Sequence, residues 1–403
     1  MTSNIFLEKL IARHDLTRGE ARGAFERIMS GQVHDAAIGA FLAALAAKGE
    51  TVDEIVGAAE AMRARVTPVR CDADCIDTCG TGGDGISTFN VSTTAAIIAA
   101  AAGATVAKHG NLSHTRVSGS AEVLKALGVN IEAGVEVVER CLREVRFGFL
   151  FARQLHPTMK YAAAARQALG IRTIINLLGP LTNPAGARRQ VIGVPQPELT
   201  EKLAEALRRL GATHVMVVHG MDGLCDLTIT GETRVTELRA ECGVRSAECG
   251  VSRTYHLGPE EVALARGRLE DLKVDSPARS ADAVRRILGG ERGPRRDHAL
   301  LNAAAALVVA GLTEDPPLAG PADPSPEGAR YASPGQRPGE PPEQQVRALK
   351  GRANPATVSL TAEDEDAAPM HDLRRGLALA AAAIDEGRAR QTLDRLIELS
   401  NQP

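Results

Sequence analysis

The sequence predicts an α/β protein, with a small N-terminal all-helical domain and a larger α/β domain built on a mostly parallel central sheet. Residues 1–66 show helical periodicity alone, whereas strand-like and helical runs alternate from Cys75 onward. At 403 residues the chain is too long for one small core. We therefore expect residues 1–70 to form the helical domain and residues 71–403 the α/β domain.

The N-terminal part is expected to contain four helices. Leu7 and Ile11 mark the apolar face of the first, and Thr17 precedes the second. The alanine-rich segments 33–47 and 52–64 follow, separated by a stop and a helix cap. None of these segments carries catalytic residue types in a pattern, so we assign them to packing and self-association.

The α/β part shows the repeated strand-then-helix pattern of a parallel sheet. The expected strands are 75–76, 105–108, 129–131, 147–151 and 214–219, and the expected helices are 121–127, 135–145, 158–169 and 203–210, with a further buried helix ending at Gly103. Ligands of such sheets bind at the carboxyl ends of the strands. Gly80, Lys108 and Asp222 each follow an expected strand, so we expect the site there.

A glycine-rich stretch, residues 77–85, is the strongest candidate for a ligand-binding loop. Its four glycines lack Cβ atoms, so their backbone N–H groups can converge on one ligand. Asn90, Ser92 and Thr93 follow where a helix begins, and a helix N-terminus attracts anions. The stretch therefore favours phosphate or pyrophosphate, although a tight strand-to-helix turn would have a similar sequence.

A dinucleotide site is a weak alternative. Gly80, Gly82 and Gly85 match G-x-G-x-x-G, but such a site needs an acidic residue about 20 positions further on. The segment 108–111, Lys-His-Gly-Asn, stands there instead. A cation and two hydrogen-bonding side chains suit more phosphate or an acidic substrate.

Composition disfavours several classes of function. Aromatic residues make up 2% of the chain and Trp is absent, which disfavours binding bases by stacking, and the net charge of −3 disfavours nucleic acid generally. The seven cysteines are an odd number, which favours a reducing cytoplasm. Cys71, Cys75 and Cys79 lack zinc-site spacing and are expected to be free thiols. No apolar run reaches the length of about 20 residues that a membrane span needs.

Two segments are expected to lie outside the core. Residues 239–253 contain a near-duplication, Ala-Glu-Cys-Gly-Val, which we interpret as a lengthened surface loop. Residues 316–371 contain eleven prolines. Such a composition buries little apolar surface, so we expect a disordered, mobile and dispensable insertion.

Taken together, ten motifs resemble the anthranilate phosphoribosyltransferase family of tryptophan biosynthesis. They are Asp-Thr-Cys-Gly-Thr-Gly-Gly-Asp (77–84), Asn-Val-Ser-Thr (90–93), Lys-His-Gly-Asn (108–111), Ser-Gly-Ser (118–120), Leu-His-Pro-Thr-Met (155–159), Arg166, Leu-Gly-Ile-Arg-Thr (169–173), Asn-Leu-Leu-Gly-Pro-Leu-Thr-Asn-Pro (176–184), His-Gly-Met-Asp-Gly (219–223) and Leu-Asn-Ala-Ala-Ala (301–305). The resemblance covers nearly the whole chain apart from the insertion.

The resemblance implies transfer of a phosphoribosyl group from 5-phosphoribosyl 1-diphosphate to anthranilate, with Mg²⁺, by a homodimer joined through the helical domain. The implied 5-phosphoribosyl 1-diphosphate contacts are Gly80, Gly83, Asp84, Thr88, Asn90, Val91, Ser92, Thr93, Lys108, His109, Gly110, Asn111, Ser113, Arg116 and Ser120. Implied anthranilate contacts are Gly80, Asn111 and Arg166, and the implied catalytic residues are Lys108, Asn111 and Arg166. A planar guanidinium matches a carboxylate, which supports Arg166. His109 and His156 could face the anthranilate or be structural.

The chain departs from the family pattern at the metal site, which the resemblance places at Ser92, Cys225 and Asp226. The family has an Asp-Glu pair where this chain has Cys225-Asp226. A thiol is a poor Mg²⁺ ligand, so we expect a weaker site or one completed by Asp222 and water. Leu112 and Val117 replace basic residues of the family. Two alternatives follow: the neighbouring Arg116 binds phosphate in their place, or the affinity for 5-phosphoribosyl 1-diphosphate is reduced.

Two other functions stay open at this point. A pyrimidine nucleoside phosphorylase-like enzyme of the same fold would carry a different loop after the Lys-His pair, and Asp84 with residues 108–111 favours the transferase. A non-catalytic nucleic-acid-binding relative would need a basic cleft, which the net charge of −3 disfavours.

Overall fold

A computed structural model describes residues 6–113, 117–240, 250–314 and 362–402. The chain divides into two compact units, one comprising Met1–Thr313 and Met370–Pro403 and the other Glu314–Pro369. The sheet and the helices that cover it belong to the first unit. Most of the second unit lies outside the described residues.

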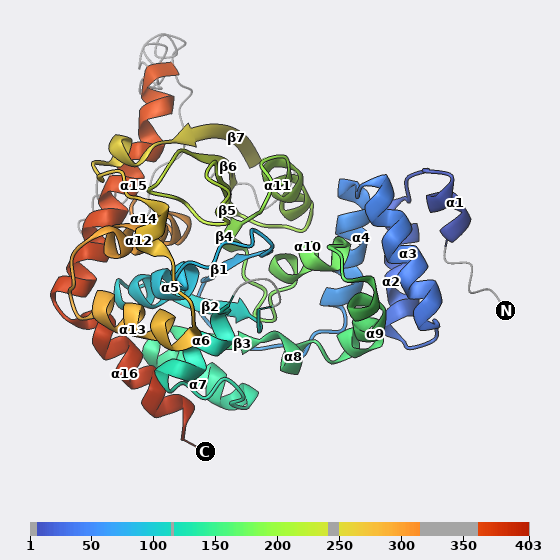
Figure 1. Ribbon diagram of the computed structural model, residues 1–403, viewed down its shortest axis with the longest axis horizontal. Helices are drawn as coiled ribbons and strands as arrows, with labels where there is room; N and C mark the ends of the chain where they lie inside the picture. Colours follow the sequence, from blue (N-terminus) through green and yellow to red (C-terminus); the bar gives the residue numbers. More distant parts are fainter. Residues whose placement is uncertain (1–5, 114–116, 241–249, 315–361, 403) are drawn as a thin grey trace, which may run out of the picture. The chain divides into compact units, whose positions relative to one another are not determined.

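A seven-stranded sheet forms the centre of the first unit, in the order β3-β2-β1-β4-β5-β6-β7 (Figure 1). The strands are β1 Cys75–Gly80, β2 Thr105–Gly110, β3 Phe147–Phe151, β4 Arg189–Gly193, β5 His214–Gly220, β6 Thr233–Ala240 and β7 Gly250–Leu257. The pairs from β3 to β5 are parallel, and β6 and β7 extend the sheet antiparallel. The sheet is therefore mostly parallel, which confirms the predicted fold class.

Both faces of the sheet are buried. On β5, Met216 and Val218 enter the core of one face, and Val215 and Val217 enter the core of the other. Successive side chains of a strand point to opposite faces, so a sheet covered on both sides needs apolar residues at every position. Continuous apolar runs such as this one place the strand in the middle of a layered α/β fold.

Helices supply the rest of both cores. The first core contains residues of α5 Val91–Ala101, α6 Ser120–Leu127, α7 Val135–Val145, α13 Pro277–Leu288, α14 Pro294–Val309 and α16 Arg388–Ser400. The second contains residues of α2 Arg18–Met29, α3 Asp35–Lys48, α4 Val52–Arg63, α9 Lys160–Leu169, α10 Ile174–Leu181 and α11 Leu199–Arg209. The other helices are α1 Leu7–Ile11, α8 Ala152–Leu155, α12 Leu269–Leu272 and α15 Ala362–Asp385, with 3₁₀ turns at Pro157–Met159 and Pro259–Val262.

The four N-terminal helices expected from the sequence are present, and two of them begin with a capping box. Thr17 accepts a hydrogen bond from the Glu20 N–H, and Thr51 accepts one from the Glu54 N–H. Each glutamate carboxylate in turn accepts from the N–H of its cap residue, so two backbone donors at each helix start are satisfied.

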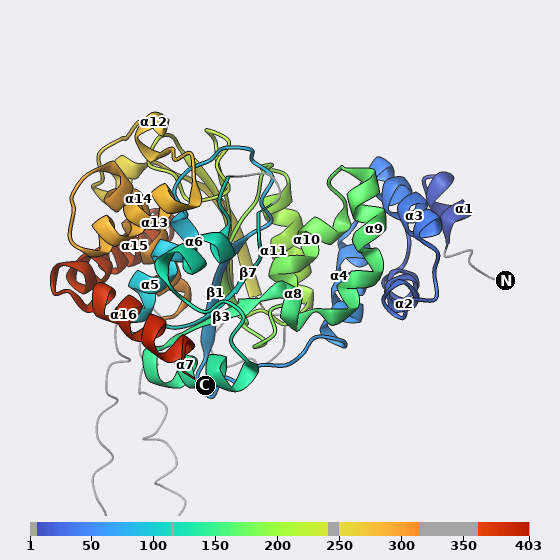
Figure 2. The same ribbon diagram turned by 60° about the horizontal axis from the view of Figure 1, so that its bottom comes forward.

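Helices α9 and α10 connect the N-terminal helices to the sheet (Figure 2). α9 packs on α2 and α3, and α10 packs on α3, α4 and β1. Arg63 at the end of α4 donates to the carbonyl oxygens of Leu181 at 2.7 Å and Leu210 at 3.0 Å. The N-terminal helices therefore share a core with later parts of the chain.

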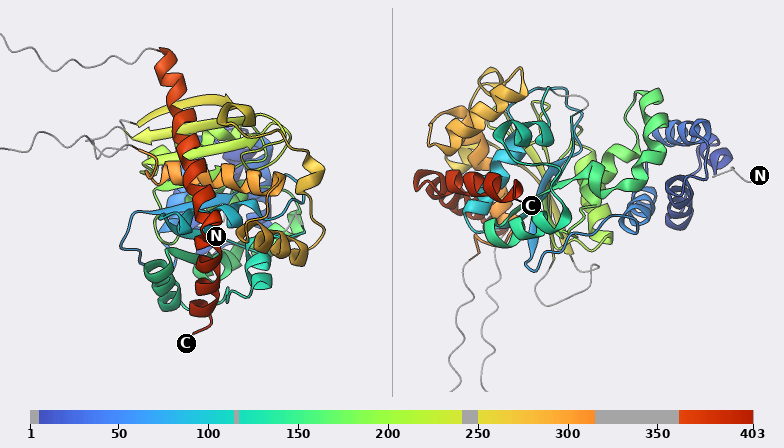
Figure 3. Two further views of the ribbon diagram at one scale, coloured as in Figure 1. Left: turned by 90° about the vertical axis from the view of Figure 1, so that its left-hand side faces the viewer. Right: turned by 90° about the horizontal axis from the view of Figure 1, so that it is seen from below.

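The last helix closes the opposite side of the first unit. α16 packs on α5, α7 and α13 through apolar residues including Leu393 and Leu396 (red in Figure 3). Among the described residues, no helix combines the length and apolar character needed to cross a membrane.

The structure corrects three sequence expectations. β1 does not end near Ile76 but continues to Gly80, because it pairs with β2 and β4 on its two sides. Residues 129–131 form no strand: the Asn130 side chain accepts from the Glu132 N–H at 3.1 Å, which makes an Asx turn. Residues 239–240 and 250–253 belong to β6 and β7 rather than to a loop, and residues 241–249 lie outside the described residues.

The expected insertion, residues 316–371, falls mostly outside the described residues. Its last ten residues, 362–371, belong to α15, so the described helix begins before the expected end of the insertion.

Candidate functional site

The glycine loop leaves the carboxyl end of β1 at the middle of the sheet. Gly82, Gly83 and Gly85 have φ values of 60°, 95° and 68°, the left-handed region that favours glycine. Gly80 pairs with Gly193 of β4, and a Cβ at Gly193 would lie 1.6 Å from the carbonyl oxygen of Cys225. Glycine is therefore required in the loop for its backbone shape, and at the end of β4 for the approach of residue 225.

The N-terminus of α5 lies directly after the loop. Asn90 caps the helix, with its Oδ1 accepting from the Thr93 N–H at 3.0 Å, as the sequence predicts. Among the described residues, the buried hydroxyls of Thr88, Thr93 and Ser118 have no hydrogen-bond partner. Buried polar groups are normally paired, so this concentration of unpaired hydroxyls is what a ligand-binding region would show.

Lys108 lies on β2 and its ammonium is buried beneath the site. Its Nζ donates to the Thr78 carbonyl oxygen at 2.5 Å and to the Ser92 Oγ at 3.3 Å. Burial lowers the pKa of Lys108 and raises the pKa of the nearby Asp77, while the attraction between the two opposes both shifts. Lys108 therefore orients Ser92 and β1, rather than extending a free cation into solvent.

Asp77 joins β1 to β2 and to the turn before β4. Its Oδ1 accepts from the His109 N–H at 3.1 Å, and its Oδ2 accepts from the Asn183 Nδ2 at 2.8 Å. Asn183 also donates to the Ala107 carbonyl oxygen at 2.8 Å. This buried network fixes the strand ends that carry the glycine loop and the Lys-His-Gly-Asn segment.

The loop after β2 approaches the same edge. A Cβ at Gly110 would lie 2.2 Å from the Ser120 Oγ, so glycine allows Ser120 to come close. Asn111 Oδ1 accepts from the Leu112 N–H at 2.8 Å, which leaves its Nδ2 group without a partner among the described residues. The Ser113 N–H donates to the Glu122 Oε1 at 3.0 Å. Arg116 lies outside the described residues.

His109 and His156 form a buried imidazole pair. His109 Nδ1 lies 3.0 Å from the Gly179 carbonyl oxygen, and the two Nε2 atoms lie 3.1 Å apart. The carbonyl can only accept, so Nδ1 of His109 carries its proton and His156 Nε2 donates to His109 Nε2. Burial lowers the pKa of His109 to about 3 and that of His156 to about 4, so both are neutral at pH 7.

Arg166 lies half-buried on α9. Burial lowers the pKa of its guanidinium, and no other described residue forms a hydrogen bond with its side chain. A desolvated guanidinium without a protein partner is suited to bind a carboxylate in two-point fashion.

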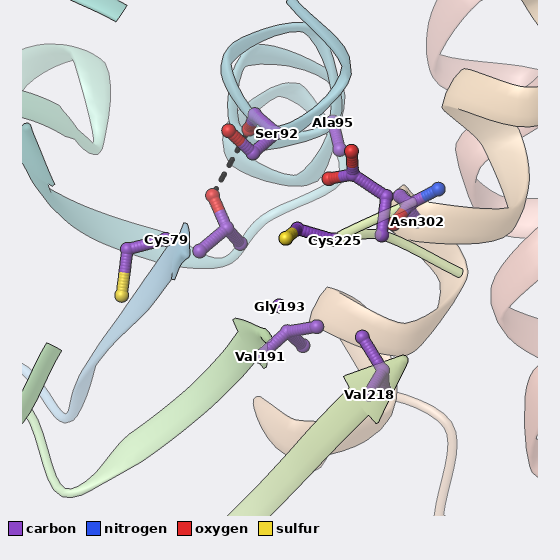
Figure 4. Close-up of a pocket in the computed structure, with 10 residues that line it drawn as sticks. Cys79, Ser92, Ala95, Val191, Gly193, Val218, Cys225 and Asn302 are labelled. Atoms are coloured by element: carbon purple, nitrogen blue, oxygen red, sulfur yellow. Dashed lines mark hydrogen bonds between the residues drawn. The ribbon is translucent and has the colours of Figure 1, made fainter. Parts of the chain in front are cut away.

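Ser92, Cys225 and Asp226 line one small cavity of about 10 Å³, together with Thr78, Cys79, Ala95, Val191, Gly193, Val218 and Asn302 (Figure 4). The cavity has room for about one water molecule. The Cys225 N–H also donates to the Asp84 Oδ2 at 3.2 Å. The three residues expected at the metal site are therefore close in space and adjoin the carboxylate of the glycine loop.

Asp222, which the sequence offered as one way to complete this group, accepts hydrogen bonds within its own turn. Its Oδ1 accepts from the Leu224 N–H at 3.1 Å, and its Oδ2 accepts from the Thr228 and Thr230 hydroxyls. Both oxygens are thus used to close the turn after β5. Among the described residues, no group of three or more His, Cys, Asp or Glu side chains is placed to hold a metal ion.

The remaining expected site residues follow from these elements. Gly80, Gly83 and Asp84 lie at the end of β1 and in its loop, and Val91 is the first residue of α5, with its side chain buried in the core. The structure thus brings the β1, α5 and β2 candidates to one edge of the sheet.

Two residues were not assigned a role from the sequence. Asn302 of α14 accepts from the Leu227 N–H at 3.1 Å and donates to the Leu227 carbonyl oxygen at 2.8 Å, which fixes the segment after Asp226. Arg172 donates to the carbonyl oxygens of Gly82 at 2.6 Å and Thr81 at 3.3 Å. In the sequence, Asn302 could have been recognised as the single amide side chain in an alanine- and leucine-rich helical segment.

Comparison with known proteins first defines the class. Residues 5–66 match the helical bundle domain of the glycosyl transferase family, and residues 72–323 match its a/b domain. The chain therefore has the helical bundle and the a/b domain of the glycosyl transferase family.

The particular family follows from full-length relatives. The chain is 52% identical over 310 residues to an anthranilate phosphoribosyltransferase from Anaeromyxobacter sp. (strain Fw109-5), covering 77% of this chain and 89% of that protein. It is 50% identical over 311 residues to the one from Desulfosudis oleivorans, with the same coverage of 77% and 89%. The chain belongs to the anthranilate phosphoribosyltransferase family, which serves tryptophan biosynthesis, and the resemblance expected from the motifs is confirmed.

Solved structures agree with this assignment. The crystal structure of anthranilate phosphoribosyltransferase from Thermus thermophilus has 36% identity and a TM-score of 0.76, covering 98% of this chain and 99% of that one. The Saccharomyces cerevisiae enzyme in complex with PRPP (5-phosphoribosyl 1-diphosphate) and Mg has 22% identity and a TM-score of 0.76, covering 99% and 98%, and shows the shared fold. Another structure of the yeast enzyme holds 4-fluoroanthranilate.

Proposed function

We propose that this chain transfers the phosphoribosyl group of 5-phosphoribosyl 1-diphosphate to the amine of anthranilate, giving N-(5-phosphoribosyl)anthranilate and diphosphate. The observation that carries the proposal is the glycine loop beside the N-terminus of α5. The N–H groups of Gly82 and Gly83 bond to no other described residue, and the helix dipole adds a partial positive charge. A diphosphate group would satisfy both features.

In the proposed reaction the amine nitrogen bonds to the anomeric carbon as the bond from that carbon to the diphosphate oxygen breaks. The electron pair leaves with diphosphate, and the amine proton passes to solvent or to the departing oxygen. The glycine-loop amides and the N-terminus of α5 stabilise the charge that grows on the leaving group. Lys108 keeps Ser92 oriented toward this group through its 3.3 Å bond.

Arg166 and Asn111 are proposed to place the acceptor. The Arg166 guanidinium, unpaired with other described residues, binds the anthranilate carboxylate. Asn111 offers its Nδ2 group, which its own Oδ1 contact with Leu112 leaves exposed to a substrate. Burial lowers the pKa of both His109 and His156, so this neutral pair offers no charge to a carboxylate. Positioning of this kind supplies much of the rate when the nucleophile is weakly basic.

The residues fit Mg²⁺ in part. Ser92 and Asp226 offer oxygen ligands beside the cavity, and Asp84 contacts residue 225, whereas the Cys225 thiol is a poor ligand for a hard cation. Mg²⁺ is often held by substrate phosphates and only one or two carboxylates, so this donor set suffices for a metal that arrives with the substrate. When bound, Mg²⁺ would neutralise diphosphate charge.

The proposal is tested by following anthranilate fluorescence with purified protein. Loss that requires 5-phosphoribosyl 1-diphosphate and Mg²⁺, with release of diphosphate, is expected. Arg166→Met should raise the KM for anthranilate by at least about tenfold, because a charged hydrogen bond is lost. A folded protein that consumes no anthranilate at high substrate would contradict the proposal. Phosphorolysis of thymidine, measured in parallel, tests the nucleoside phosphorylase alternative.

We further propose that the chain acts as a homodimer joined through its N-terminal helices, and that it acts in the cytoplasm. The division into domains at residue 70 is part of the same proposal.

A further inference from the structure

Arg172 supports the glycine loop from the side opposite to its amides. It lies in the short connection between α9 and α10, ninety residues after the loop in sequence. Its Nη1 donates to the Gly82 carbonyl oxygen at 2.6 Å, and its Nη2 donates to the Thr81 carbonyl oxygen at 3.3 Å. One guanidinium thus bonds two consecutive peptide groups.

These two bonds determine where the loop amides point. In a trans peptide the C=O and the following N–H are antiparallel. The carbonyls of Thr81 and Gly82 share their peptide planes with the N–H groups of Gly82 and Gly83. Because Arg172 binds both carbonyls, both N–H groups are directed away from it, and neither bonds to another described residue.

Gly83 provides the space that Arg172 occupies. A Cβ at Gly83 would lie 1.6 Å from the Arg172 Nη1. Gly83 also has φ of 95°, where other residues are strained. The glycine is therefore required for the guanidinium to approach, in addition to its role in exposing an amide.

The charge of Arg172 lies beside the same loop. Burial lowers the pKa of its guanidinium, and the nearby Cys225 and Asp84 oppose this shift. An arginine stays protonated at neutral pH even so. Arg172 thus adds positive charge beside the site proposed for a diphosphate.

The position of Arg172 also connects the two halves of the proposed site. It follows Arg166 of α9 by six residues and directly precedes Thr173, the N-cap of α10. The Thr173 N–H donates to the Asn176 Oδ1 at 3.0 Å, which fixes the start of α10. The connection that holds the loop is therefore the continuation of the helix that carries the candidate anthranilate-binding residue.

We propose that Arg172 is a positioning residue for the diphosphate-binding loop, holding the Thr81 and Gly82 carbonyls so that the following amides face the diphosphate. The proposal rests on the proposed function, since it assigns the diphosphate as the ligand of those amides.

The test compares Arg172→Met and Arg172→Lys with the unchanged protein. Arg172→Met should raise the KM and the calorimetric Kd for 5-phosphoribosyl 1-diphosphate by about tenfold to a hundredfold, as expected for lost bonds from a charged donor. The kcat should change by less than about threefold, because bound substrate at saturation still selects the loop conformation in which the amides face it. A lysine ammonium can reach only one of the two carbonyls well. The KM and Kd of Arg172→Lys should therefore lie between those of Arg172→Met and the unchanged protein.

A second measurement distinguishes positioning from general stability. Amide hydrogen exchange of residues 81–87 in the free protein should be faster in Arg172→Met, because the loop samples more conformations. Arg63→Met is the matched control, since Arg63 also donates to two backbone carbonyls but away from the loop. It should leave loop exchange and the affinity for 5-phosphoribosyl 1-diphosphate unchanged.

Unchanged affinity and loop exchange in Arg172→Met, or equal changes in Arg63→Met, would overturn the proposal. Failure of the proposed function has a different signature: the unchanged protein would neither bind 5-phosphoribosyl 1-diphosphate nor consume anthranilate. In that case, comparing the amide hydrogen exchange of residues 81–87 in Arg172→Met and the unchanged protein still tests whether Arg172 holds the loop.

Discussion

Cys225 stands where the family resemblance expects a carboxylate, and its surroundings explain how the chain accommodates a thiol. Its side chain is 4% exposed and its N–H donates to Asp84 at 3.2 Å. A buried thiol loses little by desolvation, whereas a carboxylate there needs a cation or several donors. The backbone contact with Asp84 keeps the segment in place whatever side chain residue 225 carries.

Cys225→Asp should lower the Mg²⁺ concentration needed for half-maximal activity by several-fold to about tenfold, because an oxygen ligand replaces a sulfur. Asp226→Ala should shift the requirement in the opposite direction. The measurement is an activity titration with Mg²⁺, together with calorimetry of 5-phosphoribosyl 1-diphosphate at fixed Mg²⁺. Cys225→Ala, which adds neither a charge nor an oxygen ligand, is the control. Identical Mg²⁺ midpoints in all four proteins would show that these residues do not contact the metal.

The His109–His156 pair makes stability depend on pH in a defined window. Histidine in an unfolded chain has a pKa of about 6.5, whereas burial lowers the pKa of His156 to about 4 and that of His109 to about 3. Between these values the unfolded chain binds protons that the folded one does not. The contribution of the pair to the free energy of unfolding is therefore fully present above pH 6.5, and it falls as the pH drops toward 4.

Urea unfolding should show a loss of roughly 2 kcal/mol between pH 7.5 and pH 5 from His156 alone. His156→Gln keeps a donor for His109 but does not titrate, so its stability should decline less over this range. Equal slopes in the His156→Gln variant and the unchanged protein would mean that folding does not lower the pKa of His156.

At the scale of elements, α5 combines a structural cap with a proposed anion site. Asn90 Oδ1 accepts from the Thr93 N–H, and the Asn90 N–H lies 2.9 Å from the Ser280 Oγ of α13. The cap is thus fixed from both sides before any ligand binds. A preorganised helix N-terminus binds an anion with little further loss of entropy.

Asn90→Ala should cost about 1 kcal/mol of stability, as loss of a cap does. It should also raise the KM for 5-phosphoribosyl 1-diphosphate, because the first turn of α5 frays. Thr51→Ala removes a cap of the same type at α4, where Thr51 Oγ1 accepts from the Glu54 N–H at 3.3 Å. The midpoint temperature of thermal unfolding should be lower in both variants. The KM for 5-phosphoribosyl 1-diphosphate should change in Asn90→Ala alone. A KM change of equal size in Thr51→Ala would assign the effect to stability.

Local sequence patterns predicted which helices and strands exist better than they predicted where those elements end. The period of apolar residues located the N-terminal helices and β5, because burial on one or two faces leaves a direct trace in sequence. β1 extended four residues beyond its expected end because ladder bonds to two neighbours outweigh the weak strand preference of Gly80. At residues 129–131 the apolar flanks suggested a strand, but the Asn130 side chain closed a turn.

At the scale of the whole molecule, the site was predictable where one segment supplies it and not where distant segments meet. The glycine loop and the Asn90 cap are encoded within a few residues of each other. The contacts of Arg172 with Gly82 and of Asn302 with Leu227 span ninety and seventy-five residues. No local period encodes such pairs, because they depend on how strands and helices are brought together.

The outward face of α3 carries the last prediction, which concerns assembly. Ile38, Phe41 and Leu42 point into the core, whereas Ala36, Ala40 and Ala47 are exposed and Ala43 is half-exposed on the other side. Spacings of three and four residues place these alanines on one stripe. Small side chains let two helices approach closely, so this stripe suits contact with a second copy of the chain in the proposed homodimer.

Ala40→Glu should convert the dimer to monomer at micromolar concentration, because a charge on each copy would be buried at the contact without a partner. Sedimentation velocity measures the change, and circular dichroism shows whether the fold is kept. Ala378→Glu on α15 is the matched control, since it adds the same charge at an exposed alanine of a helix away from α3. A dimer that persists in Ala40→Glu would move the contact off this stripe, and a monomeric unchanged protein would remove the dimer altogether.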